Sequence, residues 1–297
     1  MPPIVDVSSW KSDARRVSRP AGFLIAIQMP AAKAHRTSKF DRHSLTFSSS
    51  DQGDQTNQEE NMNKFILFIA SIFAAIAPAY AQDANDEIVV AVFDTGIAEV
   101  GALEGRVIAN YDLYKVDSPR AELQSSHGTM VANIIAEHTA ENVKFIGMRV
   151  DRTRCYGDLC EVDEKALQRA LRMSIDLEVD VIQASLSGKM HSKTRDLFVE
   201  AANKGISVIL AAGNKGGVAL AGMILKEAAG NVYVVASLDA EGRPSEFTSR
   251  MRGSLRDQMI WRLGEDVPTI DRTGSATSAT GTSFAAPLFA SELIVNR

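Results

Sequence analysis

Cysteine, aromatic residues and clustered basic residues are all scarce in this 297-residue sequence. The two cysteines, Cys155 and Cys160, have no histidine nearby, so they make a poor zinc site. No block of lysine or arginine stands out and the formal net charge is −5, so nothing suggests a surface for nucleic acids or anionic membranes. No Asp-rich loop indicates a calcium site. We therefore expect no nucleic-acid partner and predict no metal or other cofactor.

The overall composition is that of an ordinary globular protein, with 45% hydrophobic and 23% charged residues. The length allows one large domain or two small ones. Neither an internal repeat nor a linker interrupts residues 82–297, so we expect this part to form one domain.

One internal segment, residues 62–81, has the three-part pattern of a secretory signal peptide. Lys64 gives it a positive start, residues 65–77 form an uncharged and mostly apolar run, and residues 79–81 read A-x-A. The run is short for a membrane span and ends at Pro78. A buried core helix is the alternative, but the segment has no polar face. We expect an exported protein, periplasmic or extracellular, with no stable membrane span after the signal is removed.

The segment before it, residues 1–61, shows little periodicity, and residues 44–61 are polar. Because a signal peptide belongs at the N-terminus, our hypothesis is that translation starts at Met62 and that residues 1–61 are an over-called start. If the chain does begin at Met1, we expect residues 1–61 to be a disordered extension. Residues 82–297 would then be the functional domain.

The two cysteines bracket a short loop, "CYGDLC", at residues 155–160. A disulfide between them is plausible in an oxidising periplasm. Two free thiols on a loop are the alternative, which the sequence leaves open.

Apolar, β-branched runs alternate with helical patterns along residues 82–297. A helix is predicted after Asp163, which looks like an N-cap, and a second one ends near Gly205. The alternation predicts an α/β fold with three layers, in which a mostly parallel sheet carries helices on both faces. Residues 242–280 look loop-rich. The runs predicted to be strands are 88–93, 143–150, 179–186, 206–212 and 232–236.

Polar residues stand where these elements begin or end. Asp94 follows the first strand, His127 opens a helical pattern, Asn214 follows the fourth strand, and Ser283 precedes a helix of small residues. Each alone is typical of a turn or a cap. In parallel sheets, however, reactive groups gather at the carboxyl ends of the strands.

Together the four motifs resemble the subtilisin-like serine peptidases, the subtilases. They are "DTG" at 94–96, "HGT" at 127–129, "AAGN" at 211–214 and "GTSFAAP" at 281–287, and they occur in the order of that family. The resemblance covers about residues 88–297 and implies a subtilisin-like fold.

The resemblance implies a secreted serine endopeptidase that acts through an Asp-His-Ser triad and an acyl-enzyme intermediate. His127 would take the proton of Ser283, and Asp94 would orient and stabilise the imidazole. Asn214 and the backbone N–H of Ser283 would bind the oxyanion. Acyl transfer to another acceptor would use the same residues. A catalytically silent protein that binds peptides or a partner through the same groove is the alternative.

A substrate groove is implied as well. The segment "SLSG", which comprises Ser185, Leu186, Ser187 and Gly188, is similar to the family's "SLGG". An extended peptide or protein substrate would pair with it as an added strand. Ala212 and Gly213 of the "AAGN" motif would line the pocket for the residue before the scissile bond.

The sequence departs from the family pattern at several positions. Ser187 replaces a glycine and could narrow the groove, whereas Met130 and Asn133 replace a histidine and a glycine and are taken as packing changes. Lys215 follows Asn214, which suggests either a preference for acidic or polar residues before the scissile bond or a solvated lysine. Residues 82–87 leave no room for a prodomain, so a separate folding partner or inhibitor is possible.

Overall fold

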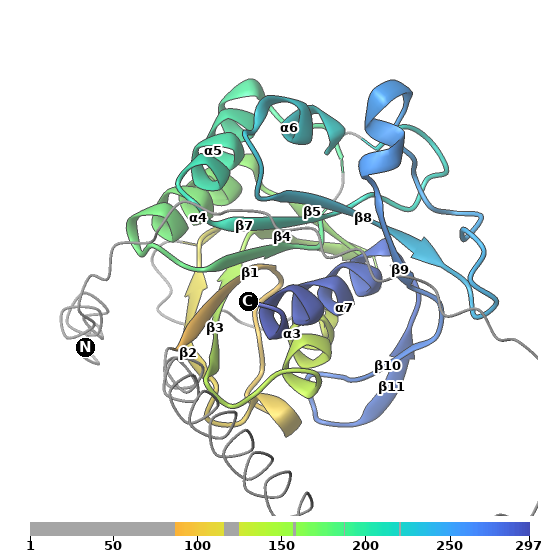
Figure 1. The fold of residues 1–297 in the computed structure, drawn as a ribbon. Coiled ribbons are helices and arrows are strands. Elements are labelled where there is room, and N and C mark those ends of the chain that lie inside the picture. The colour runs from red at the N-terminus through yellow and green to blue at the C-terminus, as the bar shows by residue number, and fades with distance from the viewer. Residues whose placement is uncertain (1–86, 116–124, 157–158, 187, 220) are drawn as a thin grey trace, which may run out of the picture. The chain divides into compact units, whose positions relative to one another are not determined.

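A seven-stranded sheet forms the centre of the protein, and all its neighbouring strands run parallel. Figure 1 shows this sheet with helices above and below it. The α/β, three-layer prediction is therefore confirmed. The strand order is β2-β3-β1-β6-β7-β8-β9, with β1 at Ile88–Asp94, β2 at Val107–Asp112, β3 at Val143–Arg149, β6 at Val181–Ala184, β7 at Ser207–Ala211, β8 at Val232–Leu238 and β9 at Ile260–Leu263.

The computed structural model describes residues 87–115, 125–156, 159–186, 188–219 and 221–297. The predictions for residues 1–61 and for the signal segment 62–81 fall outside the described residues, and so does Ser187. Within the described part of the chain, no helix is both long enough and apolar enough to cross a bilayer.

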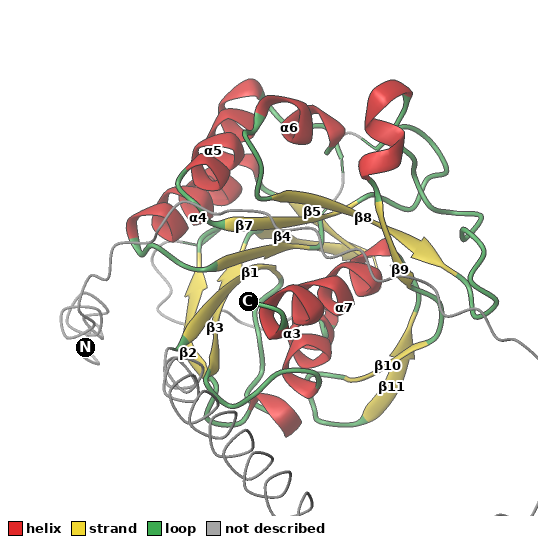
Figure 2. Cartoon of the chain, viewed as in Figure 1, coloured by secondary structure: helices red, strands yellow, loops and turns green. Residues whose placement is uncertain are grey.

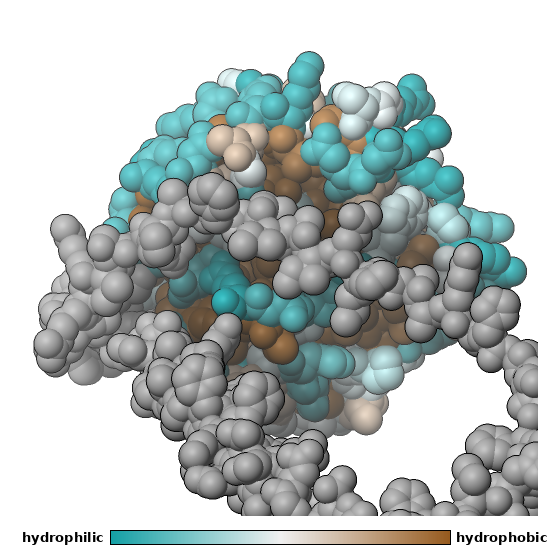
Figure 3. Space-filling model, viewed as in Figure 1, coloured by the Kyte–Doolittle hydropathy of each residue, from teal (hydrophilic) through white to brown (hydrophobic). Residues whose placement is uncertain are grey.

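The helices cover both faces of the sheet because its strands are apolar on both sides. In β1, Val90 and Val92 pack on one side, while Ala91 and Phe93 pack on the other. Figure 2 shows the resulting layers, and Figure 3 shows hydrophilic residues over the outer helices with hydrophobic residues further in. One face carries α4 (Glu164–Asp176), α5 (Ser192–Asn203) and α6 (Gly222–Glu227), and the other carries α3 (His127–Glu137) and α7 (Thr282–Val295).

Local capping signals explain where two of these helices begin and end. The Asp163 carboxylate accepts a hydrogen bond of 2.8 Å from the backbone N–H of Ala166, which makes it the N-cap of α4 as the sequence predicts. Gly205 follows α5 at a φ of +90°, a left-handed conformation that glycine adopts without strain. The predicted end of that helix is thus confirmed.

The cysteine segment forms a hairpin rather than an irregular loop. Its strands are β4 (Asp151–Tyr156) and β5 (Leu159–Val162), which run antiparallel. The register places Cys155 directly opposite Cys160. The disulfide between them stays a prediction.

Residues 242–280 contain more regular structure than the sequence analysis expects. Strand β9 joins the edge of the sheet beside β8, and β10 (Val267–Ile270) pairs with β11 (Ala276–Ala279) in a separate hairpin. The Asp271 carboxylate closes the hairpin turn by accepting hydrogen bonds from the backbone N–H groups of Thr273 and Ser275. Strands of four residues are too short to show a clear period in the sequence. Two short 3₁₀ helices, η1 (Gly101–Leu103) and η2 (Gly253–Gln258), complete the described elements.

The connections of the sheet change direction between β1 and β6. From β1 the chain moves outward to β2 and β3, whereas from β6 it proceeds through β7 and β8 to β9 on the other side. The carboxyl ends of β1 and β6 therefore flank a topological switch point, where parallel sheets place their ligand sites.

Candidate active site

The switch point gathers the polar residues that the sequence analysis singles out. Asp94 is the last residue of β1, Ser185 directly follows β6, and Asn214 lies three residues after β7. His127 opens α3, and Ser283 lies in the first turn of α7. These two helices pack on the same face of the sheet.

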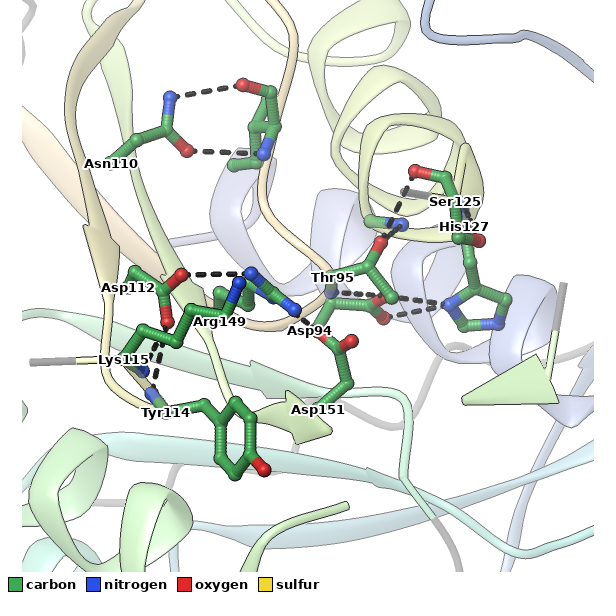
Figure 4. Close-up of polar contacts among 12 residues, drawn as sticks. Asp94, Thr95, Asn110, Asp112, Tyr114, Lys115, Ser125, His127, Arg149 and Asp151 are labelled. Carbon is green, nitrogen blue, oxygen red and sulfur yellow. Dashed lines mark hydrogen bonds and ion pairs between the residues drawn. The ribbon is translucent and has the colours of Figure 1, made fainter. Parts of the chain in front are cut away.

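Asp94 and His127 form a close pair across two elements. The Nδ1 atom of His127 lies 2.8 Å from each carboxylate oxygen of Asp94 (Figure 4). Because a carboxylate only accepts, this contact places a proton on Nδ1 and leaves Nε2 as the basic nitrogen of a neutral imidazole. Asp94 is 2% exposed, so water competes little for the pair.

Three neighbours hold this pair in place. The backbone N–H of Thr95 donates to Asp94 Oδ1 at 2.8 Å, and the Thr95 hydroxyl accepts from the N–H of Gly128 at 3.1 Å. The Ser125 hydroxyl accepts from the N–H of His127 at 3.1 Å. The start of α3 is thereby tied to the end of β1.

A second contact fixes the loop that follows Asp94. The side-chain amide of Asn110, on β2, donates to the carbonyl of Ile97 at 2.9 Å and accepts from its N–H at 3.0 Å (Figure 4). A Cβ at Gly147 would lie 2.0 Å from the Asn110 oxygen, so a side chain at this position of β3 would displace the Asn110 amide. Residues on two neighbouring strands thus set the path of the chain beyond Asp94.

Ser283 is held against the segment that follows β6. Its hydroxyl donates to the carbonyl of Ser185 at 3.3 Å, and the Ser185 hydroxyl donates to the carbonyl of Ser283 at 2.8 Å. The helix N-cap is Gly281, so Ser283 does not act as the capping residue. The ring of Phe284 lies 5.2 Å from that of His127, measured between centroids, which brings the start of α7 beside the imidazole.

Asn214 is oriented by the residue before Ser283. Its Oδ1 atom accepts from the backbone N–H of Thr282 at 2.9 Å and from the Thr282 hydroxyl at 2.8 Å. The Thr282 hydroxyl in turn accepts from the N–H of Gly213 at 3.0 Å. Since a backbone N–H can only donate, the amide oxygen of Asn214 must face Thr282, and its NH₂ group is left to bind another acceptor.

A pocket of about 200 Å³ opens beside these residues. It lies between the segments that follow β6 and β7 and the helices α4 and α5. Of the residues predicted to bind substrate, Leu186, Gly188, Ala212 and Gly213 line it, whereas Ser185 contacts Ser283 instead. The pocket therefore starts next to the candidate nucleophile.

Buried charges lie behind Asp94. Arg149 is fully buried; its Nη1 lies 2.8 Å from Asp112 and its Nε lies 3.1 Å from Asp151 (Figure 4). Burial raises the pKa of the Asp151 carboxyl above its ordinary value, and the negative charge of Asp94 acts in the same direction against the attraction of Arg149. Sequence reasoning missed this cluster, because none of its members belongs to a recognisable motif.

The two departures from the family pattern on α3 are both buried. Met130 is 5% exposed, and its carbonyl accepts from the Thr269 hydroxyl at 3.0 Å. Asn133 is 1% exposed and lies 3.5 Å from the same hydroxyl. Both residues thus join α3 to β10, in keeping with a role in packing.

Most of the chain matches the sequence model of a known protein family. A sequence model described as "Subtilase family" (Peptidase S8) matches residues 85–293. The chain belongs to the subtilase family. This membership makes it a serine-type peptidase by class, and it confirms the resemblance drawn from the four motifs.

Solved structures of subtilases share the fold. A cold-adapted subtilisin-like serine proteinase is 22% identical with a TM-score of 0.59, and the match covers 72% of this chain and 77% of that one. The prenylagaramide maturation protease PagA is 20% identical with a TM-score of 0.56, covering 73% and 77%. The self-cleaved protease domain of PatA is 19% identical with a TM-score of 0.55, covering 70% and 79%. No significant match is found among curated proteins.

Proposed function

We propose that this chain is an exported serine endopeptidase in which Asp94, His127 and Ser283 form the catalytic triad. The observation that carries the proposal is the pairing of His127 Nδ1 with both Asp94 oxygens at 2.8 Å, on a ring that packs 5.2 Å from Phe284. In this pairing Nε2 is the basic nitrogen of the imidazole, and it is the atom that would take the proton of an adjacent serine hydroxyl. Export rests on the signal-like pattern of residues 62–81.

The reaction begins with proton transfer. The Ser283 hydroxyl turns from the Ser185 carbonyl, a long contact of 3.3 Å, and gives its proton to His127 as its oxygen attacks the substrate carbonyl. The imidazolium that forms is stabilised by Asp94, which stays ionised. His127 then protonates the leaving amine, and the acyl group remains on Ser283 as an ester.

The negatively charged oxygen of the tetrahedral intermediate is stabilised by hydrogen-bond donors. The Asn214 NH₂ group supplies one, since its oxygen is held by Thr282. The backbone N–H of Ser283 supplies a second, at the positive end of the α7 dipole. Water then attacks the ester with His127 as the base, which releases the second product.

A fluorophosphonate probe tests the proposal, because it labels only an activated serine. We expect the full chain to be labelled, Ser283→Ala to lose all labelling, and Ser254→Ala, a control at an exposed serine of η2, to keep it. The unlabelled chain should also cleave an unstructured protein at internal peptide bonds, and labelling with the probe beforehand should abolish this cleavage. A folded chain that takes up no probe would overturn the proposal and favour a silent binding protein.

A further inference from the structure

We propose that the pocket beside Ser283 selects substrates with an acidic side chain, glutamate above all, on the residue whose carbonyl is attacked. The inference rests on the proposed peptidase function and adds its substrate class. Three features of the pocket carry it: its position, the charges of its lining residues, and a hydroxyl that has no hydrogen-bond partner among the described residues.

The position of the pocket makes it the receptor for that side chain. Gly213 and Asn214 line the pocket, and both hydrogen-bond to Thr282, the residue before the nucleophile. A carbonyl held between Ser283 and the Asn214 amide therefore has its own side chain at the pocket mouth. A volume of about 200 Å³ suits one side chain.

Two lysines give the pocket a positive charge. Lys189 follows β6 and Lys215 follows β7, so the cations come from the segments after two neighbouring strands. Both are exposed, and neither makes a hydrogen bond or an ion pair with another described residue. An acidic substrate side chain would thus meet two cations that no described carboxylate neutralises.

Glu164, the acidic residue in the described pocket lining, already accepts two hydrogen bonds from other residues. Oε1 of Glu164 accepts from the backbone N–H of His191 at 2.8 Å and from the Thr194 hydroxyl. Both contacts hold the carboxylate at the start of α5. Among the described lining residues no other carboxylate is present, so the two lysines outnumber the acids.

The rest of the lining suits a glutamate stem and its carboxylate. Leu186, Phe198 and Leu210 give apolar walls for the methylene groups. Ser249 also lines the pocket and is 5% exposed, and its hydroxyl makes no hydrogen bond to the described residues. A carboxylate that reaches it would gain a donor inside the pocket as well as the lysines at its mouth.

Fluorogenic peptides that differ only at the residue before the cleaved bond test the inference. We expect the full chain to cleave the glutamate peptide with a higher kcat/KM than the isosteric glutamine peptide at low salt. Lys189→Gln and Lys215→Gln should each reduce the Glu-to-Gln ratio about 2- to 5-fold, the range for a partly exposed ion pair. The ratio should also fall as salt rises.

Lys204→Gln is the matched control. Lys204 is an exposed lysine at the C-terminal end of α5 and is not among the residues that line the pocket, so its removal should leave the ratio unchanged. A ratio of one in the unmodified chain, or a ratio that Lys189→Gln and Lys215→Gln together do not change, would overturn the inference.

Failure of the proposed function has a different signature. A folded chain that neither takes up fluorophosphonate nor cleaves any peptide would reject the peptidase proposal. The pocket is then judged by binding, measured by fluorescence anisotropy with peptides that end in glutamate or glutamine. Tighter binding of the glutamate peptide that depends on Lys189 and Lys215 supports the inference, and equal binding overturns it.

Discussion

At the scale of single residues, the amide of Asn214 shows how a common side chain gains a defined direction. Thr282 offers it two donors, the backbone N–H and the hydroxyl, and both point to the same amide oxygen. The amide can satisfy them in one orientation only, which leaves its NH₂ group to donate to another acceptor. A donor fixed before the reaction needs no reorganisation as charge develops.

Replacing Asn214 with aspartate tests this orientation. Asn214→Asp keeps an oxygen for Thr282 and removes the NH₂ donor, so we expect kcat to fall about 10²–10³-fold with little change in KM, a range that comes from subtilisin itself. Steady-state kinetics would measure both constants. A loss of kcat with unchanged thermal unfolding would support the role of Asn214 as an oxyanion donor. An unchanged kcat would show that Asn214 only holds the start of α7 through Thr282.

At the scale of elements, the contact between α3 and β1 leaves no room for a side chain. A Cβ at Gly128 would lie 2.4 Å from the Gly96 carbonyl oxygen and 3.1 Å from Asp94 Cβ. The first of these is a backbone atom that cannot rotate away. The close approach brings His127, the preceding residue, within reach of Asp94.

We therefore expect Gly128→Ala to push α3 away from β1. The free energy of unfolding should drop by about 1–3 kcal/mol, as in other overpacked interiors, and kcat/KM should fall with it because His127 moves from Asp94. Urea unfolding and peptide hydrolysis measure the two effects. Gly217→Ala is the control for stability, since among the described residues a Cβ there meets a single atom, at 4.0 Å.

At the scale of the whole molecule, the buried charges join the edge strand of the sheet to its neighbour and to the β4-β5 hairpin. Asp112 ends β2, Arg149 ends β3 and Asp151 begins β4, so the ion pairs join three strands behind the active site. Arg149 Nη2 is buried without a hydrogen-bond partner among the described residues. Such a cluster couples local protonation to the stability of the fold.

The raised pKa of Asp151 determines how the stability of the folded chain changes with pH. Since its pKa is above the ordinary 3.8, the folded state holds the proton more tightly than the unfolded state. The stability that this adds is complete below pH 3.8 and is lost as the pH rises through the folded-state pKa. Asp151→Asn cannot ionise, so we expect its free energy of unfolding, relative to that of the unmodified chain, to rise over this window. Urea unfolding at several pH values measures the difference, and a difference that does not vary with pH would contradict the prediction.

Local sequence predicted much of the fold. The capping carboxylate of Asp163 and the left-handed Gly205 were readable because each acts within a few residues of its own position. The strands of residues 242–280 were missed because a four-residue strand is stabilised by its partner rather than by its own pattern.

The sequence by itself determined the family and the fold class, because the order of the motifs and the alternation of strands and helices can be recognised from the order of the residues. Only the tertiary structure decided which side chains meet. His127 joins Asp94, Ser283 joins Ser185, and Lys189 and Lys215 reach one pocket, across separations that no local pattern encodes. These contacts depend on the strand order, and that order is fixed by how the apolar faces of sheet and helices pack together.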